Sequence, residues 1–308
     1  MKPRARFTIA IVGAGKVGTV LGRVLVENGH QVVCVVSRTT ASARRAGKYL
    51  RCRTTSTELS SIPPETNLIF ISTPHGAVAD VARELARTGG LEFRRIAVCH
   101  ASGMLTASVL DPLAMRGAIV FSFHPLQTFP RDFPPAKILP TARGISFGVD
   151  GPPAGIRVAR RLARALEGLV IEIRPEMREL YHAACVVASN HLTTVMSVAE
   201  TMFVAAGGSG FSRSFAPIVD ATIRNIRMTS PAAALSGPVA RGGVGTVARH
   251  LEMIAGNTPQ LLPYFCAVSL ETVRLAIAKG SISRDQADQL TTLIREYLGR
   301  VPDTEVTT

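Results

Sequence analysis

The stretch IVGAGKVG at residues 11–18 constrains the fold of this chain more than any other part of its sequence. A strand-like apolar run leads into it, and residues 16–28 carry Val and Leu at helical spacing after it. Glycines 13, 15 and 18 then read Gly-x-Gly-x-x-Gly between a strand and a helix, which is typical of a unit that binds a dinucleotide. In such a loop Gly13 allows a tight turn, Gly15 lets the backbone approach a pyrophosphate and Gly18 lets the helix pack closely. The alternative is a tight strand–helix turn without a ligand.

The end of the next predicted strand, residues 31–36, indicates which dinucleotide would bind. Sites specific for NAD place an acidic residue about 20 positions beyond the loop, where it holds the ribose 2′-hydroxyl. Here Ser37, Arg38 and Thr39 follow the strand, with no carboxylate beside them. Because arginine pairs bidentately with phosphate, Arg38 favours NADP(H). The alternative is an arginine that is simply solvated at a strand end.

The chain alternates strand-like and helix-like segments up to about residue 174, which predicts an α/β domain with a doubly wound parallel sheet. The predicted strands are 7–12, 31–36, 51–54, 67–72, 96–99, 118–123, 144–147 and 170–173. Residues 175–308 show helical patterns only, beginning with one long helix over 175–206. We therefore predict a nucleotide-binding domain at 1–174 and an all-α domain for substrate binding and dimerisation at 175–308.

Composition excludes several classes of protein. A hydrophobic fraction of 46% indicates a globular chain, and five scattered cysteines without a C-x-x-C pair favour a reducing cytoplasm over a disulfide or zinc framework. No apolar stretch approaches the roughly 20 residues of a spanning helix, so we expect no membrane partner. The net charge is +13, but the arginines are scattered and aromatic residues make up 5%. This favours an enzyme for anionic ligands over a nucleic-acid-binding protein.

Three predicted strands end in polar residues, and the carboxyl ends of parallel strands meet at one edge of a sheet. The sequences at these ends are STPHG, CHASG and FHPLQTF. We expect the first two to contact the cofactor and the last to line the catalytic cleft. The cofactor contacts predicted in total are Gly13, Gly15, Lys16, Val17, Gly18, Ser37, Arg38, Ser72, Thr73, Pro74 and His100. A satisfied structural histidine is the alternative at each strand end, and we expect no metal site.

The helical half carries two further polar groups. His182, Ser189 and Asn190 fall on one face of the predicted long helix, because they are seven and eight residues apart. Arg241 lies beside glycines in SGPVARGGVG, where it could clamp a carboxylate. An internal hydrogen-bond network at a dimer interface, and a helix cap at Arg241, are the alternatives.

The segments IVGAGKVG, ISTPHGAV, HASG, HPLQTF, YHAACVVASNH and SGPVARGGVGTVARHL together resemble Rossmann-like NADP oxidoreductases whose helical C-terminal half is a domain of unknown function. That family is similar to pyrroline-5-carboxylate reductase, 6-phosphogluconate dehydrogenase and ketopantoate reductase. The resemblance implies a cytoplasmic homodimer that joins through the helical half. It also implies hydride transfer to a small anionic carbonyl compound, with ketopantoate as the best candidate. An imine reductase of the pyrroline-5-carboxylate type and a non-catalytic NADP(H) sensor are the alternatives.

The sequence departs from ketopantoate reductases in one respect. Those enzymes carry a catalytic lysine on the first long helix of the helical half, whereas residues 175–206 contain no lysine here. We expect His182 to act as general acid instead, because histidine suits proton transfer near neutral pH. The other predicted roles are catalytic for Ser102, Asn190 and His124, and substrate-binding for Arg241, Gln127 and Ser189.

Overall fold

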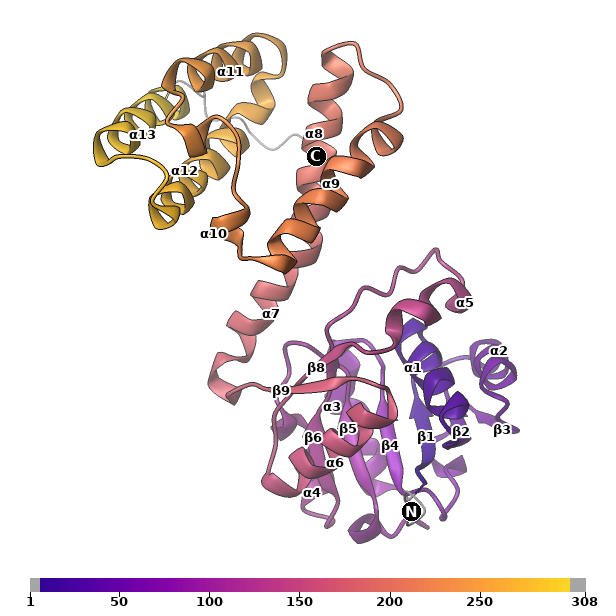
Figure 1. The fold of residues 1–308 in the computed structure, drawn as a ribbon. Coiled ribbons are helices and arrows are strands. Elements are labelled where there is room, and N and C mark those ends of the chain that lie inside the picture. The colour runs from indigo at the N-terminus through magenta and orange to yellow at the C-terminus, as the bar shows by residue number, and fades with distance from the viewer. Residues whose placement is uncertain (1–5, 300–308) are drawn as a thin grey trace. The chain divides into compact units, whose positions relative to one another are not determined.

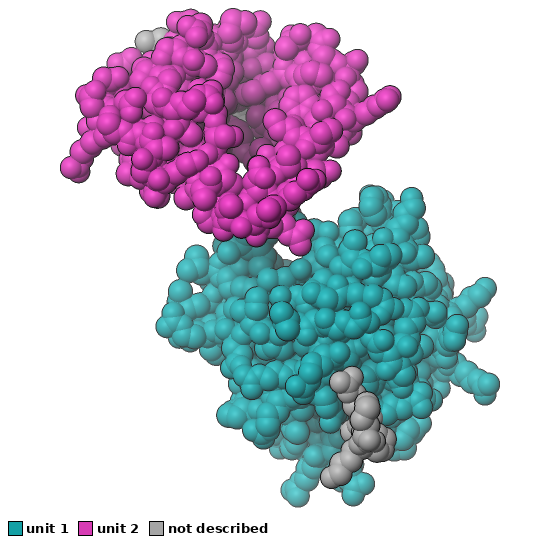
Figure 2. All heavy atoms as spheres, in the orientation of Figure 1, with its two compact units in different colours: residues 1–189 teal, residues 190–308 magenta. Residues whose placement is uncertain are grey.

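The computed structural model describes residues 6–299, and they divide between Ser189 and Asn190 into two compact units, unit 1 and unit 2 (Figures 1 and 2). The division falls inside the helical run that begins at Pro175, because the first turns of that run pack with the sheet. The domain boundary predicted from sequence, at 174/175, stays a prediction.

Unit 1 is built on a six-stranded parallel sheet in the order β3-β2-β1-β4-β5-β6. The strands are β1 (Thr8–Val12), β2 (Gln31–Val36), β3 (Thr54–Ser56), β4 (Leu68–Ile71), β5 (Ala97–His100) and β6 (Ile119–Ser122). The strand order reverses between β1 and β4, which is the point where open α/β sheets bind ligands. The predicted α/β class and its parallel sheet are confirmed.

Helices cover both faces of this sheet, and this is why its strands are continuous apolar runs. The helices are α1 (Lys16–Glu27), α2 (Thr40–Leu50), α3 (His75–Arg87), α4 (Asp111–Ala114), α5 (Pro135–Ile138) and α6 (Pro153–Ala165). Alternate residues of β1 enter two different cores. Ile9 and Ile11 pack in the core that α1 and α6 cover, whereas Ala10 and Val12 pack in the core that α3 covers.

The two last predicted strands do not join the main sheet. They are β8 (Ser146–Val149) and β9 (Leu169–Glu172), and together with β7 (His124–Pro125) they form a second sheet of three strands. In it β7 pairs antiparallel with β8, and β8 pairs parallel with β9. The chain leaves the main sheet after β6, and Phe123 stacks on Phe147 of β8. A second difference from the prediction concerns β3, which begins at Thr54 and not at Arg51, because Arg51 caps α2 in the left-handed conformation.

The single helix predicted over 175–206 is divided. A short turn at Pro175–Met177 leads into α7 (Arg178–Val186), a π-helical segment at Val187–His191 follows, and α8 (Leu192–Ala205) continues from it. A π turn contains an extra residue, so the spacing of a regular α-helix does not carry through it. His182 therefore does not share a helical face with Ser189 and Asn190 in the way that the sequence spacing predicts.

Unit 2 contains helices and, over its described residues to 299, no strand. Beyond α8 its helices are α9 (Phe211–Met228), α10 (Pro231–Ala234), α11 (Val244–Asn257), α12 (Leu262–Lys279) and α13 (Arg284–Leu298). Its core lies among α11, α12 and α13, with Leu251, Cys266 and Leu290 fully buried. The all-α character predicted for this half is confirmed.

One helical stretch, Pro259–Lys279, is long and apolar enough to cross a membrane by length and composition alone, with a mean hydropathy of 1.5. This corrects the expectation that no stretch reaches that length. Leu262, Cys266 and Val273 of the same stretch lie in the core of unit 2. Core helices of soluble proteins pass the same test, so the finding is weak evidence for a membrane partner.

Candidate functional site

A cleft of about 560 Å³ lies at the carboxyl ends of β1, β2 and β4 in unit 1. The glycine loop forms one wall of it, and the residues that follow β2 and β4 form the others. Seven of the predicted cofactor contacts line it together: Gly13, Gly15, Ser37, Arg38, Ser72, Thr73 and Pro74. These strand ends therefore meet at one place, where the strand order reverses, and their role in cofactor binding stays a prediction.

The three glycines of the loop serve different purposes. Gly13 has a φ of +108°, and a Cβ atom there would lie 2.7 Å from the backbone of Ser72 and Thr73. A Cβ atom at Gly18 would collide with the Ser72 hydroxyl. Gly15 has an ordinary φ of −74°, and the nearest protein atom to its Cβ position is 3.9 Å away. The fold thus requires Gly13 and Gly18, whereas the space over Gly15 is open to a ligand.

Polar groups around this cleft also fit a nucleotide. The hydroxyl of Thr73 is buried without a hydrogen-bond partner in the described structure, and a buried hydroxyl normally has one. Arg38 is exposed and forms no ion pair with any residue in the range 6–299. One carboxylate, Glu84 of α3, also lines the cleft. The open space over Gly15, the orphaned hydroxyl and the free guanidinium suit a dinucleotide with an additional phosphate.

The remaining cofactor contacts predicted from sequence do not line this cleft. Lys16 begins α1 and faces a neighbouring groove, and Val17 packs against the core. His100 is fully buried, and its Nδ1 accepts a hydrogen bond from the Ser102 N–H at 3.2 Å. Its Nε2 lies 3.1 Å from the Thr106 carbonyl, which it donates to. His100 therefore holds its own loop, and its predicted role in cofactor binding is wrong.

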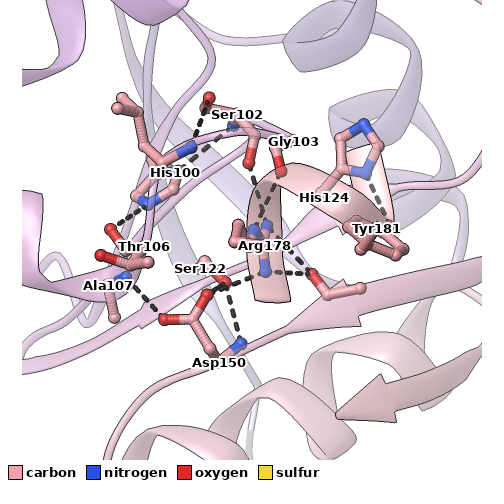
Figure 3. Close-up of polar contacts among 12 residues, drawn as sticks. His100, Ser102, Gly103, Thr106, Ala107, Ser122, His124, Asp150, Arg178 and Tyr181 are labelled. Atoms are coloured by element: carbon pink, nitrogen blue, oxygen red, sulfur yellow. Dashed lines mark hydrogen bonds and ion pairs between the residues drawn. The ribbon is translucent and has the colours of Figure 1, made fainter. Parts of the chain in front are cut away.

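At the ends of β5 and β6 a buried ion pair fastens the first turn of α7 to the strand-end loops (Figure 3). The Nη1 atom of Arg178 lies 2.8 Å from Oδ2 of Asp150. Arg178 also donates to the carbonyls of Gly103 and Ser102, each at 3.0 Å. Asp150 in turn accepts from the Ser122 hydroxyl at 2.5 Å. Every member of this network has a partner, which is what a buried charge requires.

This network positions an aromatic cluster from β7 and α7. The Nδ1 atom of His124 lies 2.8 Å from the Tyr181 hydroxyl, and its ring centroid lies 6.1 Å from that of His182. A Cβ atom at Gly103 would overlap the His182 ring and lie 2.9 Å from Nε2 of His124. The absence of a side chain at Gly103 therefore lets the two imidazoles approach the β5 loop.

Burial decides the charge states of this cluster. Desolvation, and to a smaller extent the nearby Arg178 cation, together lower the pKa of His124 to about 4. Desolvation also raises the pKa of the Tyr181 phenol. At neutral pH His124 is therefore an uncharged imidazole and Tyr181 an uncharged phenol, so this pair exchanges a hydrogen bond rather than an ionic contact.

The other predicted site residues have different surroundings. Ser102 accepts a hydrogen bond from the Leu105 N–H at 3.2 Å, and its hydroxyl proton stays available. Gln127 donates to the Thr141 carbonyl and accepts from the Thr128 N–H, each at 2.7 Å, so both ends of its amide hold a loop. Its predicted role in substrate binding stays a prediction. Ser189 ends unit 1, whereas Asn190 and Arg241 are exposed side chains of unit 2. Their predicted roles stay predictions.

Sequence reasoning missed Arg178, Asp150 and Tyr181. Arg178 could not be told apart from the other arginines, because a buried ion pair leaves no spacing pattern. Tyr181 stood in the quoted segment YHAACVVASNH beside His182, and its proximity to His124 depends on where α7 starts. Among the described residues no group of three His, Cys, Asp or Glu side chains could hold a metal ion.

Comparison with known protein families gives a match for each half of the chain. Residues 2–125 match the family described as Rossmann-like domain, and residues 145–272 match the Domain of unknown function (DUF2520). The chain thus carries both of these domains, in the order that the sequence motifs implied. No curated protein matches the sequence.

Solved structures share this architecture. A Bacteroides fragilis protein with a provisional assignment as an NADP oxidoreductase is 21% identical, with a TM-score of 0.65 over 96% of this chain and 99% of that one. A reductive aminase from Aspergillus terreus, in complex with NADPH and ethyl-5-oxohexanoate, is 16% identical, with a TM-score of 0.58 over 96% and 94%. A pyrroline-5-carboxylate reductase from Coxiella burnetii is 15% identical, with a TM-score of 0.57 over 97% and 100%. At these identities the likeness establishes the fold.

Proposed function

We propose that this protein is an NADP(H)-dependent oxidoreductase that transfers a hydride to a small anionic carbonyl compound. The observation that carries the proposal is Gly15, since neither its φ nor its packing requires a glycine, and the space beside it opens into the cleft. Arg38 supports NADP(H) over NAD(H), because a free guanidinium at the end of β2 would attract the 2′-phosphate. The provisional name of the B. fragilis protein and the NADPH complex of the reductive aminase support the same cofactor.

The roles of the chain's own residues follow from their positions. The loop at Gly13–Gly18 and the N-terminus of α1 would hold the pyrophosphate, and Thr73 would donate its unpaired hydroxyl to the ligand. A bound reduced nicotinamide dinucleotide supplies the hydride. Ser102 would donate a hydrogen bond to the carbonyl oxygen, where negative charge develops. His124 is uncharged and fixed by Tyr181, so it would line the cleft and orient the substrate.

We assign the proton donor to His182. Its ring lies beside Gly103 and is half-buried, and no hydrogen bond to it is present within the described residues. His182 would thus be free to deliver a proton to the oxygen that Ser102 holds. Arg241, Asn190 and Ser189 are proposed to contact the substrate from the helical half, with Arg241 binding its anionic group.

Ketopantoate is the substrate that we propose first, from the family resemblance. The second candidate is a cyclic or acyclic imine, and it is favoured by the fold shared with a reductive aminase and a pyrroline-5-carboxylate reductase. An imine can arrive already protonated and then needs no strong general acid. A third reading, a non-catalytic NADP(H) sensor, would bind the cofactor and turn over neither compound.

The test is NADPH oxidation at 340 nm by the purified chain, with 2-ketopantoate, with pyrroline-5-carboxylate and with neither. Turnover with ketopantoate alone supports the first candidate, and turnover with the imine alone supports the second. Binding of NADPH without turnover across a wider panel of keto acids and imines would contradict the enzyme and favour the sensor.

We further propose a cytoplasmic homodimer that joins through unit 2. Helix α8 has no buried residue within the described chain although it is rich in Val, Met and Phe. Its exposed apolar side chains, Leu192, Val195 and Val204, would be stabilised if a second copy packed on them. Light scattering at micromolar concentration should give twice the chain mass of 32.8 kDa, and a mass equal to one chain would contradict the dimer.

A further inference from the structure

A second cleft lies beside the glycine loop, and the proposed reaction does not use it. It is an open groove of about 900 Å³ that shares Ala14 and Gly15 with the cofactor cleft. Its walls come from α1, α2 and the segment that contains α5, all within unit 1. Figure 1 shows α5 beside α1 and α2 in that unit.

The groove is strongly basic. Lys16, Arg45, Lys48 and Arg131 line it, and none of them forms an ion pair with any residue that the structure describes. The lining also contains Arg23 and Glu27, but these two side chains pair with each other at 2.7 Å. Four cations therefore line one groove, and within residues 6–299 none of the four is paired with a carboxylate.

These cations come from three separate elements. Lys16 begins α1, Arg45 and Lys48 lie on α2, and Arg131 lies in the connection between β7 and β8. That connection falls between the two ranges matched by known domain families, 2–125 and 145–272. Gln127 ties it internally by its bond to Thr141, so the connection is folded over α1 rather than free. A cluster gathered from three elements differs from a solvated stripe along one helix.

The floor of the groove is apolar and includes an aromatic ring. Ala46, Pro135 and Leu139 line it beside Tyr49, and the Arg23 guanidinium lies 5.7 Å from the centre of the Tyr49 ring. Arg23 also donates to the Tyr49 carbonyl at 3.2 Å, which fixes this wall. The chemistry therefore combines phosphate-binding cations with a surface on which a flat or apolar group can lie.

We propose that this groove binds a second anion that carries several phosphates, at the same time as the dinucleotide occupies its own cleft. Lys16, Arg45, Lys48 and Arg131 bind the phosphates. The apolar floor takes the remainder of the ligand. This site does not depend on the reaction assigned to the other cleft.

Inorganic triphosphate is the probe, because it lacks an adenosine that could enter the cofactor cleft. It is titrated calorimetrically into the full-length chain saturated with NADP⁺. We expect binding to the unaltered protein and a loss of about tenfold or more in the Arg45→Ala/Lys48→Ala variant, since hydrogen bonds to charged groups are the strong ones. The matched control is Arg44→Ala/Arg53→Ala, which removes the same net charge from exposed residues outside the groove.

Three results would overturn the proposal. Triphosphate could fail to bind, the control variant could weaken binding as much as the groove variant, or saturating NADP⁺ could abolish binding. The last result would place the anion at the cofactor's own phosphates. If the chain fails to bind NADP⁺, the titration without it still separates the two variants, so failure of the proposed reaction and failure of this site are distinguishable. Thermal unfolding of both variants checks that each remains folded.

Discussion

Nη1 of Arg178 lies 2.8 Å from Oδ2 of Asp150, and both side chains are almost completely withdrawn from solvent. The pair joins the first residue of α7 to the residue that follows β8. Because Arg178 also bonds the carbonyls of the β5 loop, it sets where Tyr181 and His182 lie relative to His124.

Replacing Asp150 by Ala should lower the free energy of unfolding by about 3–5 kcal/mol, because it leaves the Arg178 cation buried without a counter-ion. Urea denaturation of the full chain measures the change. Arg174→Ala is the control, since Arg174 is exposed and lies 3.9 Å from Glu176. That variant should stay within about 0.5 kcal/mol of the parent. Equal effects of the two variants would show that the buried pair does not stabilise the fold.

Substitutions at two glycines of the loop test ligand binding and folding separately. Gly15→Ala should keep the thermal stability of the chain but weaken NADPH binding by about tenfold or more, because a methyl group fits the protein and fills the ligand's space. Gly13→Ala should instead lower stability, since its φ is +108° and its Cβ would lie 2.7 Å from backbone atoms. If Gly15→Ala bound NADPH normally, the loop would be a strand–helix turn without a ligand.

The proton donor can be tested by substitution. His182→Ala should lower kcat by about 10²-fold or more with little change in NADPH affinity, because loss of general acid catalysis acts on the chemical step. His250→Ala, an exposed histidine of α11, should leave kcat unchanged. Full turnover by His182→Ala would remove His182 from this role.

Acid should destabilise unit 1 through its buried histidines. Burial lowers the pKa of His100 from 6.5 to about 4, and that of His124 by a similar change. Between these values the unfolded chain binds protons that the folded chain does not, so stability is fully present above pH 6.5 and falls as the pH drops towards 4. For His100 the loss is on the order of 3 kcal/mol. His100→Gln should flatten this dependence in urea denaturation, and an unchanged slope would contradict it.

Local sequence signals predicted which strand ends meet at the candidate cofactor cleft. The glycine loop, Ser37–Arg38 and Ser72–Pro74 each follow a strand directly, and parallel strands bring such residues together without further information. The same reasoning failed for His100, because a strand-end histidine can turn into the core as easily as into a cleft. His100 is held by bonds to Ser102 and Thr106, only two and six residues away.

Features that depend on long-range packing were not predictable. Asp150 and Arg178 are 28 residues apart, and nothing in their neighbours marks either as buried. The π-helical segment at Val187–His191 likewise changed the spacing on which the grouping of His182 with Asn190 depended. The sequence signals were local, whereas these contacts follow from how β8 and α7 meet.

The most direct test of the central claim is a fluorescence titration of the chain, and of its Arg38→Ala variant, with NADPH and with NADH. The account predicts that the parent binds NADPH at least about tenfold more tightly than NADH, and that Arg38→Ala removes the difference by weakening NADPH alone. Equal affinities for the two cofactors in the parent, unchanged in the variant, would contradict the assignment of NADP(H) to this cleft.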